Sequence, residues 1–501
     1  MANTAPNTVE EPRPKVNIKV IVGIMLAGAF VAILNQTLLV TALPHIMRDL
    51  KIDATAAQWL TTIFMLVNGI MIPITAYLID KFNTRALFIT SIGLFALGTL
   101  IAAISPTFGV LLVGRVIQAA GAGIVMPLMQ TVFLVIFPKE SRGAAMGMIG
   151  LVISFAPAIG PTLSGWVVDT FSWRDLFYII LPIAVLDLVI AIFALKNVGK
   201  LRDPKLDMTS VVLSTIGFGG LLYGFSTASK GWNDPIVIIT IAVGAISLLL
   251  FVRRQFKLEQ PLLEFRVFKD RLFTISMIIT VIVFTAMIGA STLLPLYIQN
   301  ARHLSAVQSG LIVLPGAILM GIMSPITGRI FDKIGAKTLG VTGLALLLIG
   351  TVPFTMLSDQ TPVWLIMVMF AMRMLGLSMV MMPVTTAGLN QLPTHLLSHA
   401  TAMNNTLRQV GGSIGTAVLI TVFTNASASA AMSGKPADLS MIHGTNMAFM
   451  VASILSAAAL VMIFFLKEPP RRDRQSGTAK AAKSEGQRNS SSQQAKPVSQ
   501  S

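Results

Sequence analysis

The sequence has no cysteine among its 501 residues, and charged residues make up only 12% of it. Without cysteine there is no disulfide framework and no thiolate metal site. Soluble domains carry about 25% charged residues, so this chain has too little charge to cover the surface of a cytosolic enzyme of its length. The hydrophobic fraction of 54% instead predicts a protein that lies in a lipid bilayer.

Sequence signatures of nucleotide, metal and cofactor chemistry are also missing. The chain contains no GxxxxGK[ST] loop, which excludes an ATP-driven pump. His395 and His399 are four residues apart, but the segment HLLSH lacks the glutamate of a zinc-protease helix. No acid-base cluster points to an enzyme. We therefore expect no cofactor and no metal.

Long apolar runs separated by short polar breaks predict an all-α integral membrane protein with fourteen transmembrane helices. Each run has about the 20 residues that are needed to cross the hydrocarbon layer. The runs lie at residues 18–43, 58–79, 86–104, 108–136, 143–168, 175–195, 208–228, 235–252, 272–298, 306–328, 338–357, 362–388, 400–424 and 446–466.

The charge is sparse but unbalanced, with 37 Lys+Arg against 21 Asp+Glu and a formal net charge of +16. Most of the basic residues fall in alternate loops and in the polar tail after residue 466, which predicts that these segments and both termini are cytoplasmic. The charge is thus a topology signal, and we expect no nucleic-acid partner. The basic residues left inside the predicted spans are Arg115, Arg373 and Arg408.

Two segments of the chain repeat each other. PITAYLIDKFNTR starts at Pro73 and PITGRIFDKIGAK starts at Pro325, and Asp-Lys occurs at the same offset in both. Two related halves in a helical membrane protein favour a transporter whose site lies at the interface between the repeats.

These motifs carry a family resemblance. The Asp-Lys loops resemble the cytoplasmic signature of the major facilitator superfamily, LLVGRVIQAAGAG resembles its helix-4 signature, and APAIGPTLSG resembles its helix-5 antiporter signature. QPLLEFRVFKDR, LLPLYIQNARHLSAVQSG and NNTLRQVGGSIGTA resemble segments of the fourteen-helix drug:proton antiporters, in particular the multidrug and lincomycin-resistance permeases. The resemblance covers the chain from about residue 20 to residue 466.

The resemblance implies two six-helix halves with two additional helices between them. The expected parts are a cytoplasmic N-terminal segment at 1–17, a first half at 18–195, the additional helices at 196–271, a second half at 272–466 and a disordered basic tail at 467–501. It also implies a gate on the cytoplasmic side. The residues expected there are Asp80, Lys81, Arg85, Asp332, Lys333 and Lys337.

The proton-coupling residues are less clear, because Asn35 stands where the group usually has an aspartate in the first helix. An amide cannot exchange a proton. Arg115 lies at a similar depth, so the two side chains would hydrogen-bond if their helices are neighbours, and we expect Arg115 to couple proton and substrate, with a packing-satisfied arginine as the alternative. Asp187 is the carboxylate nearest to mid-bilayer; it is either the proton carrier or a neutral structural group.

Other candidates concern flexibility and substrate binding. Gly160, Pro161 and Gly165 form either an antiport hinge or an ordinary small-residue packing surface. Drug sites combine apolar area with a few polar groups. The residues expected to line such a site are Gln36, Gln118, Met126, Phe284, Asn404, Asn405 and Arg408.

Together these features predict a monomeric transporter of the bacterial plasma membrane that exports amphipathic drugs in exchange for protons. The alternative is a transporter of an endogenous metabolite. A membrane enzyme would need an acid-base or metal cluster, and a channel has less reason to be built from two halves.

Overall fold

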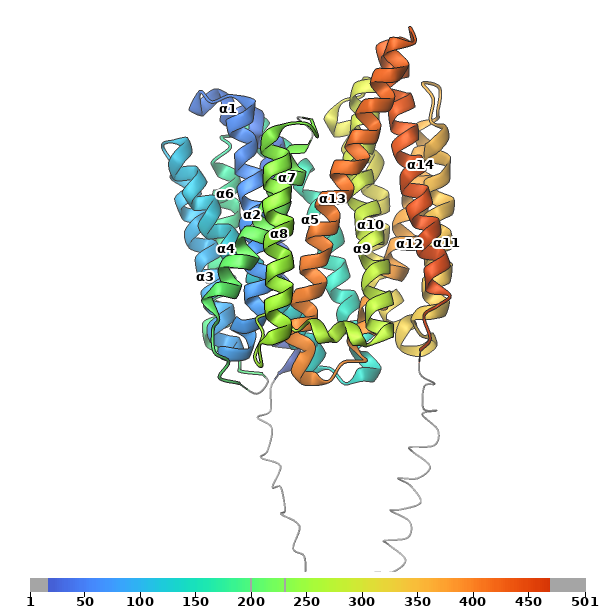
Figure 1. Cartoon of the computed structure of the whole chain (residues 1–501). Helices are drawn as coiled ribbons and strands as arrows, with labels where there is room; N and C mark the ends of the chain where they lie inside the picture. The colour runs from blue at the N-terminus through green and yellow to red at the C-terminus, as the bar shows by residue number, and fades with distance from the viewer. Residues whose placement is uncertain (1–16, 199–200, 229–230, 469–501) are drawn as a thin grey trace, which may run out of the picture. The chain divides into compact units, whose positions relative to one another are not determined.

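The computed structural model describes residues 17–198, 201–228 and 231–468. Fourteen helices in these ranges are long and apolar enough to cross a membrane, as predicted (Figure 1). They are α1 (Ile18–Leu50), α2 (Ala54–Lys81), α3 (Thr84–Ala103), α4 (Phe108–Ile136), α5 (Arg142–Thr170), α6 (Asp175–Ala194), α7 (Met208–Thr227), α8 (Pro235–Lys257), α9 (Arg271–Leu296), α10 (Ala306–Ile334), α11 (Ala336–Thr351), α12 (Val363–Leu389), α13 (Leu397–Met432) and α14 (Ala437–Ile463). The N-terminal segment and most of the basic tail lie outside the described residues.

Short polar residues define where several helices begin. The side chains of Asp53, Asn83 and Asp270 each accept a hydrogen bond from a backbone N–H of the first turn of α2, α3 and α9. Such caps satisfy the donors that a helix start leaves unpaired. The polar residues between the apolar runs therefore fix where these helices begin, in addition to indicating the topology.

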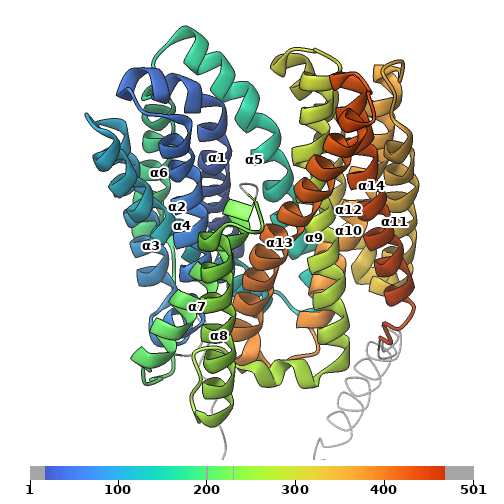
Figure 2. The ribbon, with the colours of Figure 1, turned by 45° about the horizontal axis from the view of Figure 1, so that its top comes forward.

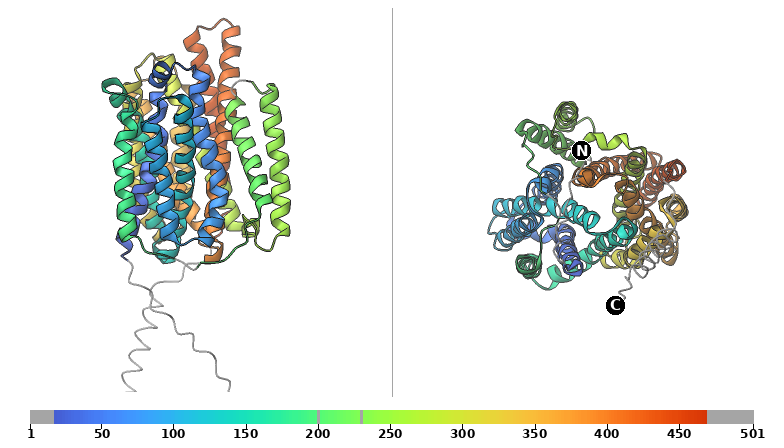
Figure 3. Two further views of the ribbon diagram at one scale, coloured as in Figure 1. Left: turned by 90° about the vertical axis from the view of Figure 1, so that its left-hand side faces the viewer. Right: turned by 90° about the horizontal axis from the view of Figure 1, so that it is seen from below.

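The helices form two groups with an additional hairpin beside them. α1 packs on α4, α5 and α6, and α9 packs on α12, α13 and α14. α5 lies along α10, while α13 contacts α2 and α4, so these pairs join the first group (α1–α6) to the second (α9–α14) (Figure 2). The α7–α8 hairpin contacts α2 and α13 and stands at the edge of the bundle (Figure 3).

The contact between α5 and α10 depends on glycine. A Cβ on Gly147 would lie 2.5 Å from the backbone oxygen of Ser324, and the neighbouring Gly143 and Gly328 face each other in the same way. Any side chain there would separate the two helices. The sequence thus brings the two groups into backbone contact at one end.

Several helices are longer than the apolar runs suggested, among them α1, α13 and α14, which begins at Ala437 rather than near residue 446. α1 continues to Leu50 rather than ending near residue 43, and α13 runs over Leu397–Met432 rather than 400–424. The additional segment of α13 is rich in Ala and Ser, so it continues the helix although it has few large apolar side chains. Figure 1 shows α13 and α14 extending beyond the other helices at the top.

Candidate functional site

The end of the bundle that carries Asp80 and Asp332 is called here the Asp-Lys face; it lies at the bottom of Figure 1. Asp332, near the end of α10, accepts hydrogen bonds from the backbone N–H groups of Gly143 at 2.8 Å and Ala144 at 2.9 Å. Those donors belong to the first turn of α5. The Asp332 carboxylate therefore caps a helix of the other group, where a negative charge is favoured by the helix dipole.

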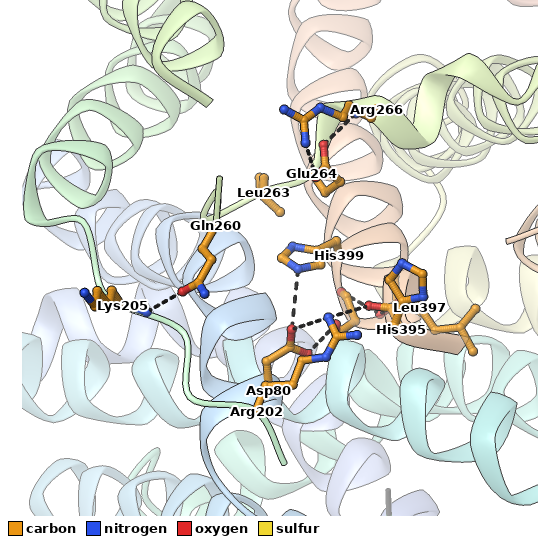
Figure 4. A network of polar contacts seen from close by, with 12 residues as sticks. Asp80, Arg202, Lys205, Gln260, Leu263, Glu264, Arg266, His395, Leu397 and His399 are labelled. Carbon is orange, nitrogen blue, oxygen red and sulfur yellow. Dashed lines mark hydrogen bonds and ion pairs between the residues drawn. The ribbon is translucent and has the colours of Figure 1, made fainter. Parts of the chain in front are cut away.

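Asp80 makes the corresponding contact from α2 with different partners. Its carboxylate accepts a hydrogen bond from the Ser398 hydroxyl at 2.6 Å and lies 3.5 Å from Nε2 of His399, both at the start of α13. Arg202, in the segment between α6 and α7, lies 4.0 Å from the same carboxylate and donates its backbone N–H to the Asp80 carbonyl at 2.9 Å. Figure 4 shows His399 and Arg202 converging on Asp80.

The basic residues expected beside these acids have other positions. Lys81 pairs with Asp203 at 3.4 Å, and Arg85 donates its backbone N–H to Asn197 at 3.1 Å. Both contacts fasten the α6–α7 segment to the end of α2 and the start of α3. Lys333 and Lys337 are exposed.

Two connecting segments enclose a cavity of about 460 Å³ around Asp80. Its walls come from the α6–α7 segment, the α8–α9 segment, the end of α2 and the start of α13. Asp207 lies at its edge and accepts hydrogen bonds from Nε and Nη2 of Arg254 at 2.6 and 2.8 Å. The Arg254 guanidinium holds the pKa of Asp207 well below its usual range. The α7–α8 hairpin is thereby fastened at its base.

Contacts between the two groups continue deeper along α4 and α13. The hydroxyls of Thr131 and Thr401 lie 2.7 Å apart, and Asn405 donates to Gln130 at 2.8 Å. Within the described part of the chain, every hydrogen bond that joins α1–α6 to α9–α14 lies in the Asp-Lys face or within about three helical turns of it.

Arg115 is fully buried in α4 and is bonded to its own group of helices. Its Nε donates to the Leu60 carbonyl at 3.2 Å, its Nη1 donates to Gln118 at 2.7 Å, and the guanidinium lies 4.2 Å from the centre of the Phe64 ring. Nη2 has no partner. Arg373 is buried in the same way, with Thr351 and the Ala286 carbonyl as acceptors.

The expected hydrogen bond between Arg115 and Asn35 is not formed. α1 and α4 are neighbours, but the guanidinium turns to α2, where a carbonyl and an aromatic face accept it. Asn35 is buried, and its Nδ2 has no partner. Gln118 uses both ends of its amide within the first group of helices: Oε1 accepts from Arg115, and Nε2 donates to Thr99 at 2.8 Å.

Asp187 lies inside the first group. It is 5% exposed, and its Oδ2 has no partner and lies 2.9 Å from where a Cβ of Gly28 would be, beside Phe88 and Ile92. The carboxyl is thus enclosed by α1, α3 and α6. Every other carboxylate of the described spanning helices lies at a helix end.

The residues expected to bind substrate lie in different surroundings, and some have hydrogen-bond partners while others have none. Arg408 of α13 is buried with its guanidinium 4.5 Å from the centre of the Phe284 ring of α9. Asn404, one turn earlier, is fully buried and both atoms of its amide lack partners. Asn405 is bonded to Gln130. Gln36 and Met126 are half-buried in α1 and α4.

The small residues of α5 differ among themselves. A Cβ on Gly160 would lie 2.8 Å from Cβ of Thr37, so α5 packs closely on α1 there. Gly165 has open space around it, and Pro161 lies within the helix. Packing accounts for Gly160 but leaves Gly165 without a packing partner.

Sequence reasoning missed His399, Ser398 and Arg202 as partners of Asp80. The sequence places His395 and His399 in a polar break without a metal-binding motif, and no motif marks Arg202. The i,i+1 pair of polar residues at the start of a long helix was the available signal for Ser398 and His399.

The chain is similar to known transporters over most of its length. The Major Facilitator Superfamily profile matches residues 25–416. The "Uncharacterized MFS-type transporter YcnB" of Bacillus subtilis (strain 168) is 58% identical over 466 residues, which is 93% of this chain and 98% of that protein. The "Lincomycin resistance protein LmrB" of the same organism is 43% identical over 457 residues, covering 89% and 95%.

More distant similarities agree with these. The "Multidrug export protein EmrB" of Haemophilus influenzae is 30% identical over 409 residues, covering 80% of this chain and 79% of that protein. Two solved structures share the fold with a TM-score of 0.62: the human organic anion transporter MFSD10, at 15% identity with 89% and 99% of the chains covered, and the proton:xylose symporter XylE, at 14% identity with 90% and 96% covered. This chain belongs to the major facilitator superfamily and is a multi-pass membrane transporter of small molecules.

Proposed function

We propose that this protein exports amphipathic drugs in exchange for protons by alternating access. One observation carries the mechanism: the hydrogen bonds between the described parts of α1–α6 and α9–α14 lie at the Asp-Lys face or within about three helical turns of it. Two rigid groups joined by breakable polar contacts at one end suit a transporter that rocks around a central site. The drug substrate is supported by relatives named for lincomycin resistance and multidrug export.

In this proposal α1–α6 and α9–α14 are the two halves that move, and residues 196–271 form an insertion. The bias of Lys and Arg toward the Asp-Lys loops makes that face cytoplasmic, with both termini on the same side of a bacterial plasma membrane. The structure then corresponds to a state in which the cytoplasmic gate is closed. Asp332 on the α5 N-terminus and Asp80 on Ser398 and His399 hold it closed.

Proton coupling is assigned to the first half. Asp187 is the proton carrier in this proposal, because it is the carboxylate that lies away from the helix ends in an apolar surrounding. Gly28, against which it packs, lies seven residues before Asn35, so both face the same side of α1 at a separation of about 10 Å. Arg115 and Asn35 are assigned to the same coupling region, although they do not bond to each other. A neutral structural carboxyl is the competing assignment for Asp187.

The test is efflux from vesicles that contain only the purified protein. A pH gradient is imposed, and anionic, neutral and cationic amphipathic compounds are compared, with lincomycin among the cations. We expect saturable, gradient-dependent movement of at least one compound, which stops when the gradient is collapsed by an ionophore. Gradient-independent or absent movement of every compound would show that this protein is not a proton-coupled drug exporter.

A further inference from the structure

Arg408 is a buried cation that no group of the described protein neutralises. Its side chain is 5% exposed, its Nε and Nη1 have no hydrogen-bond partner, and its contact is with the face of Phe284. The other buried arginines of the described helices differ, because Arg115, Arg142 and Arg373 each donate to a carbonyl and to a polar side chain. Leaving guanidinium donors unpaired in an apolar surrounding is costly.

A second unpaired group lies beside it. Asn404 is fully buried, and neither its Oδ1 nor its Nδ2 has a partner. Residues four apart lie on one face of a helix, one turn from each other. Asn404 and Arg408 therefore present unused hydrogen-bonding atoms on the same side of α13.

This position lies next to the boundary between the two groups of helices. Thr401 and Asn405 bond to Thr131 and Gln130 of α4. Arg408 follows them by seven and three residues, so it continues the same face of α13 one turn beyond the last of these bonds. In a transporter that rocks about this boundary, such a place becomes accessible to a substrate.

From this we infer that Arg408, Asn404 and Phe284 bind the anionic group of the substrate, so that the exported compounds are amphipathic anions. The inference rests on the proposed export function and specifies its substrate class. A guanidinium pairs with the oxygens of a carboxylate or sulfonate in a bidentate way. The Asn404 amide supplies a further donor, and the Phe284 ring supplies apolar area for the adjoining body.

The charges around the site favour the same class. The carboxylates of the described spanning helices lie at helix ends, apart from Asp187 between α1, α3 and α6. No carboxylate of the described spanning helices is paired with Arg408, so a cationic drug would meet a positive charge that is not neutralised. The site therefore attracts anions and repels cations.

Equilibrium binding to the full-length protein tests this in nanodiscs of zwitterionic lipid, with empty discs subtracted. The probes are anilinonaphthalene sulfonate and N-phenylnaphthylamine, which share an aromatic body but differ in the sulfonate. We expect the wild type to bind the sulfonate at least about 10-fold more tightly, since charge-assisted hydrogen bonds are the strong ones. Arg408→Gln should weaken sulfonate binding about 10- to 100-fold and leave the neutral probe unchanged, while Arg408→Lys should retain part of the preference.

Arg253→Gln is the matched control, because it removes an exposed arginine at the end of α8. The inference is wrong if the wild type does not prefer the sulfonate, if lincomycin, an amine, binds more tightly than the sulfonate, or if Arg408→Gln binds the sulfonate as the wild type does. The wild-type comparison decides even if the variant does not fold. Because binding needs no gradient, selective binding without gradient-driven efflux would contradict only the export proposal, and gradient-driven efflux without charge selectivity would contradict only the anion site.

Discussion

The Asp332 contact gives the sharpest prediction about the gate. The half-buried Asp332 carboxylate accepts the N–H groups of Gly143 at 2.8 Å and Ala144 at 2.9 Å. Asp332→Asn keeps the shape but removes the charge, and the amide can accept only through Oδ1. The closed arrangement should therefore lose a charge-assisted hydrogen bond and the favourable interaction with the start of α5.

The magnitude follows from those two losses. A hydrogen bond to a charged group is worth about 1.5–3 kcal/mol against about 0.5–1.5 for a neutral one, and a charge at a helix N-terminus adds about 0.3–1 kcal/mol. Partial exposure reduces both terms, which leaves about 2 kcal/mol against the closed state. At about 1.4 kcal/mol for each factor of ten, the equilibrium between closed and open states shifts about 30-fold.

The assay is the distribution of distances across the Asp-Lys face. Because the chain contains no cysteine, Lys139→Cys and Lys337→Cys place one spin label at each exposed position without background labelling. Double electron–electron resonance should show a larger population at long distance in Asp332→Asn than in the doubly labelled wild type.

The control is Asp49→Asn, which breaks a 2.6 Å ion pair with Arg174 inside the first group of helices. It should leave the distances unchanged. If Asp332→Asn also leaves them unchanged while the labelled protein remains folded, the Asp332 cap does not hold the gate closed.

Three further predictions concern other parts of the molecule. Asp187→Asn should abolish the response of efflux to a pH gradient; undiminished proton-coupled efflux would make Asp187 a structural carboxyl. Arg115→Ala should lower proton-driven transport at least about 10-fold, about 1.4 kcal/mol, whereas a normal rate would refute its coupling role. Asp207→Asn should lower the thermal stability at pH 7, because the Arg254 bonds that depress the pKa of Asp207 favour the folded state only while the carboxylate is ionised. That stability is present above the ordinary pKa of an aspartate and is lost as the pH falls through the depressed value. The difference in melting temperature between wild type and Asp207→Asn should therefore shrink in acid, and a constant difference would contradict the argument.

The sequence determines the spans well, because a run of about 20 apolar residues has few alternatives to a transmembrane helix. The ends of the helices are harder to predict, as α13 shows. The segment after residue 424 has the polarity of a loop, yet it continues the helix to Met432. The repeat around Asp80 and Asp332 was visible in the sequence, and both acids do lie at contacts between the two groups of helices.

The partners of those acids could not be read in the same way. Asp332 meets backbone N–H groups, while Asp80 meets side chains and Arg202 from a connecting segment. Which partner an acid meets depends on how helices cross, and a one-dimensional pattern contains no crossing angle. The same reason applies to Arg115, whose guanidinium bonds the Leu60 carbonyl rather than Asn35. Equal depth in the membrane does not predict a contact unless the rotation of α4 about its axis is also known.

The attachment of the α7–α8 hairpin has a consequence for protein engineering. Its leading segment is tied to the α2–α3 corner through Arg85, Lys81 and Asp80. Among the described residues of that segment, Arg202 donates to the His395 carbonyl, at 3.4 Å, just before α13. In a twelve-helix deletion variant that replaces residues 196–271 with a short tether, Ser398 and His399 would still contact Asp80, but Arg202 would be missing. The closed state of this variant should be less stable at the contact between α2 and α13, while the contact of Asp332 with α5 would be unaffected.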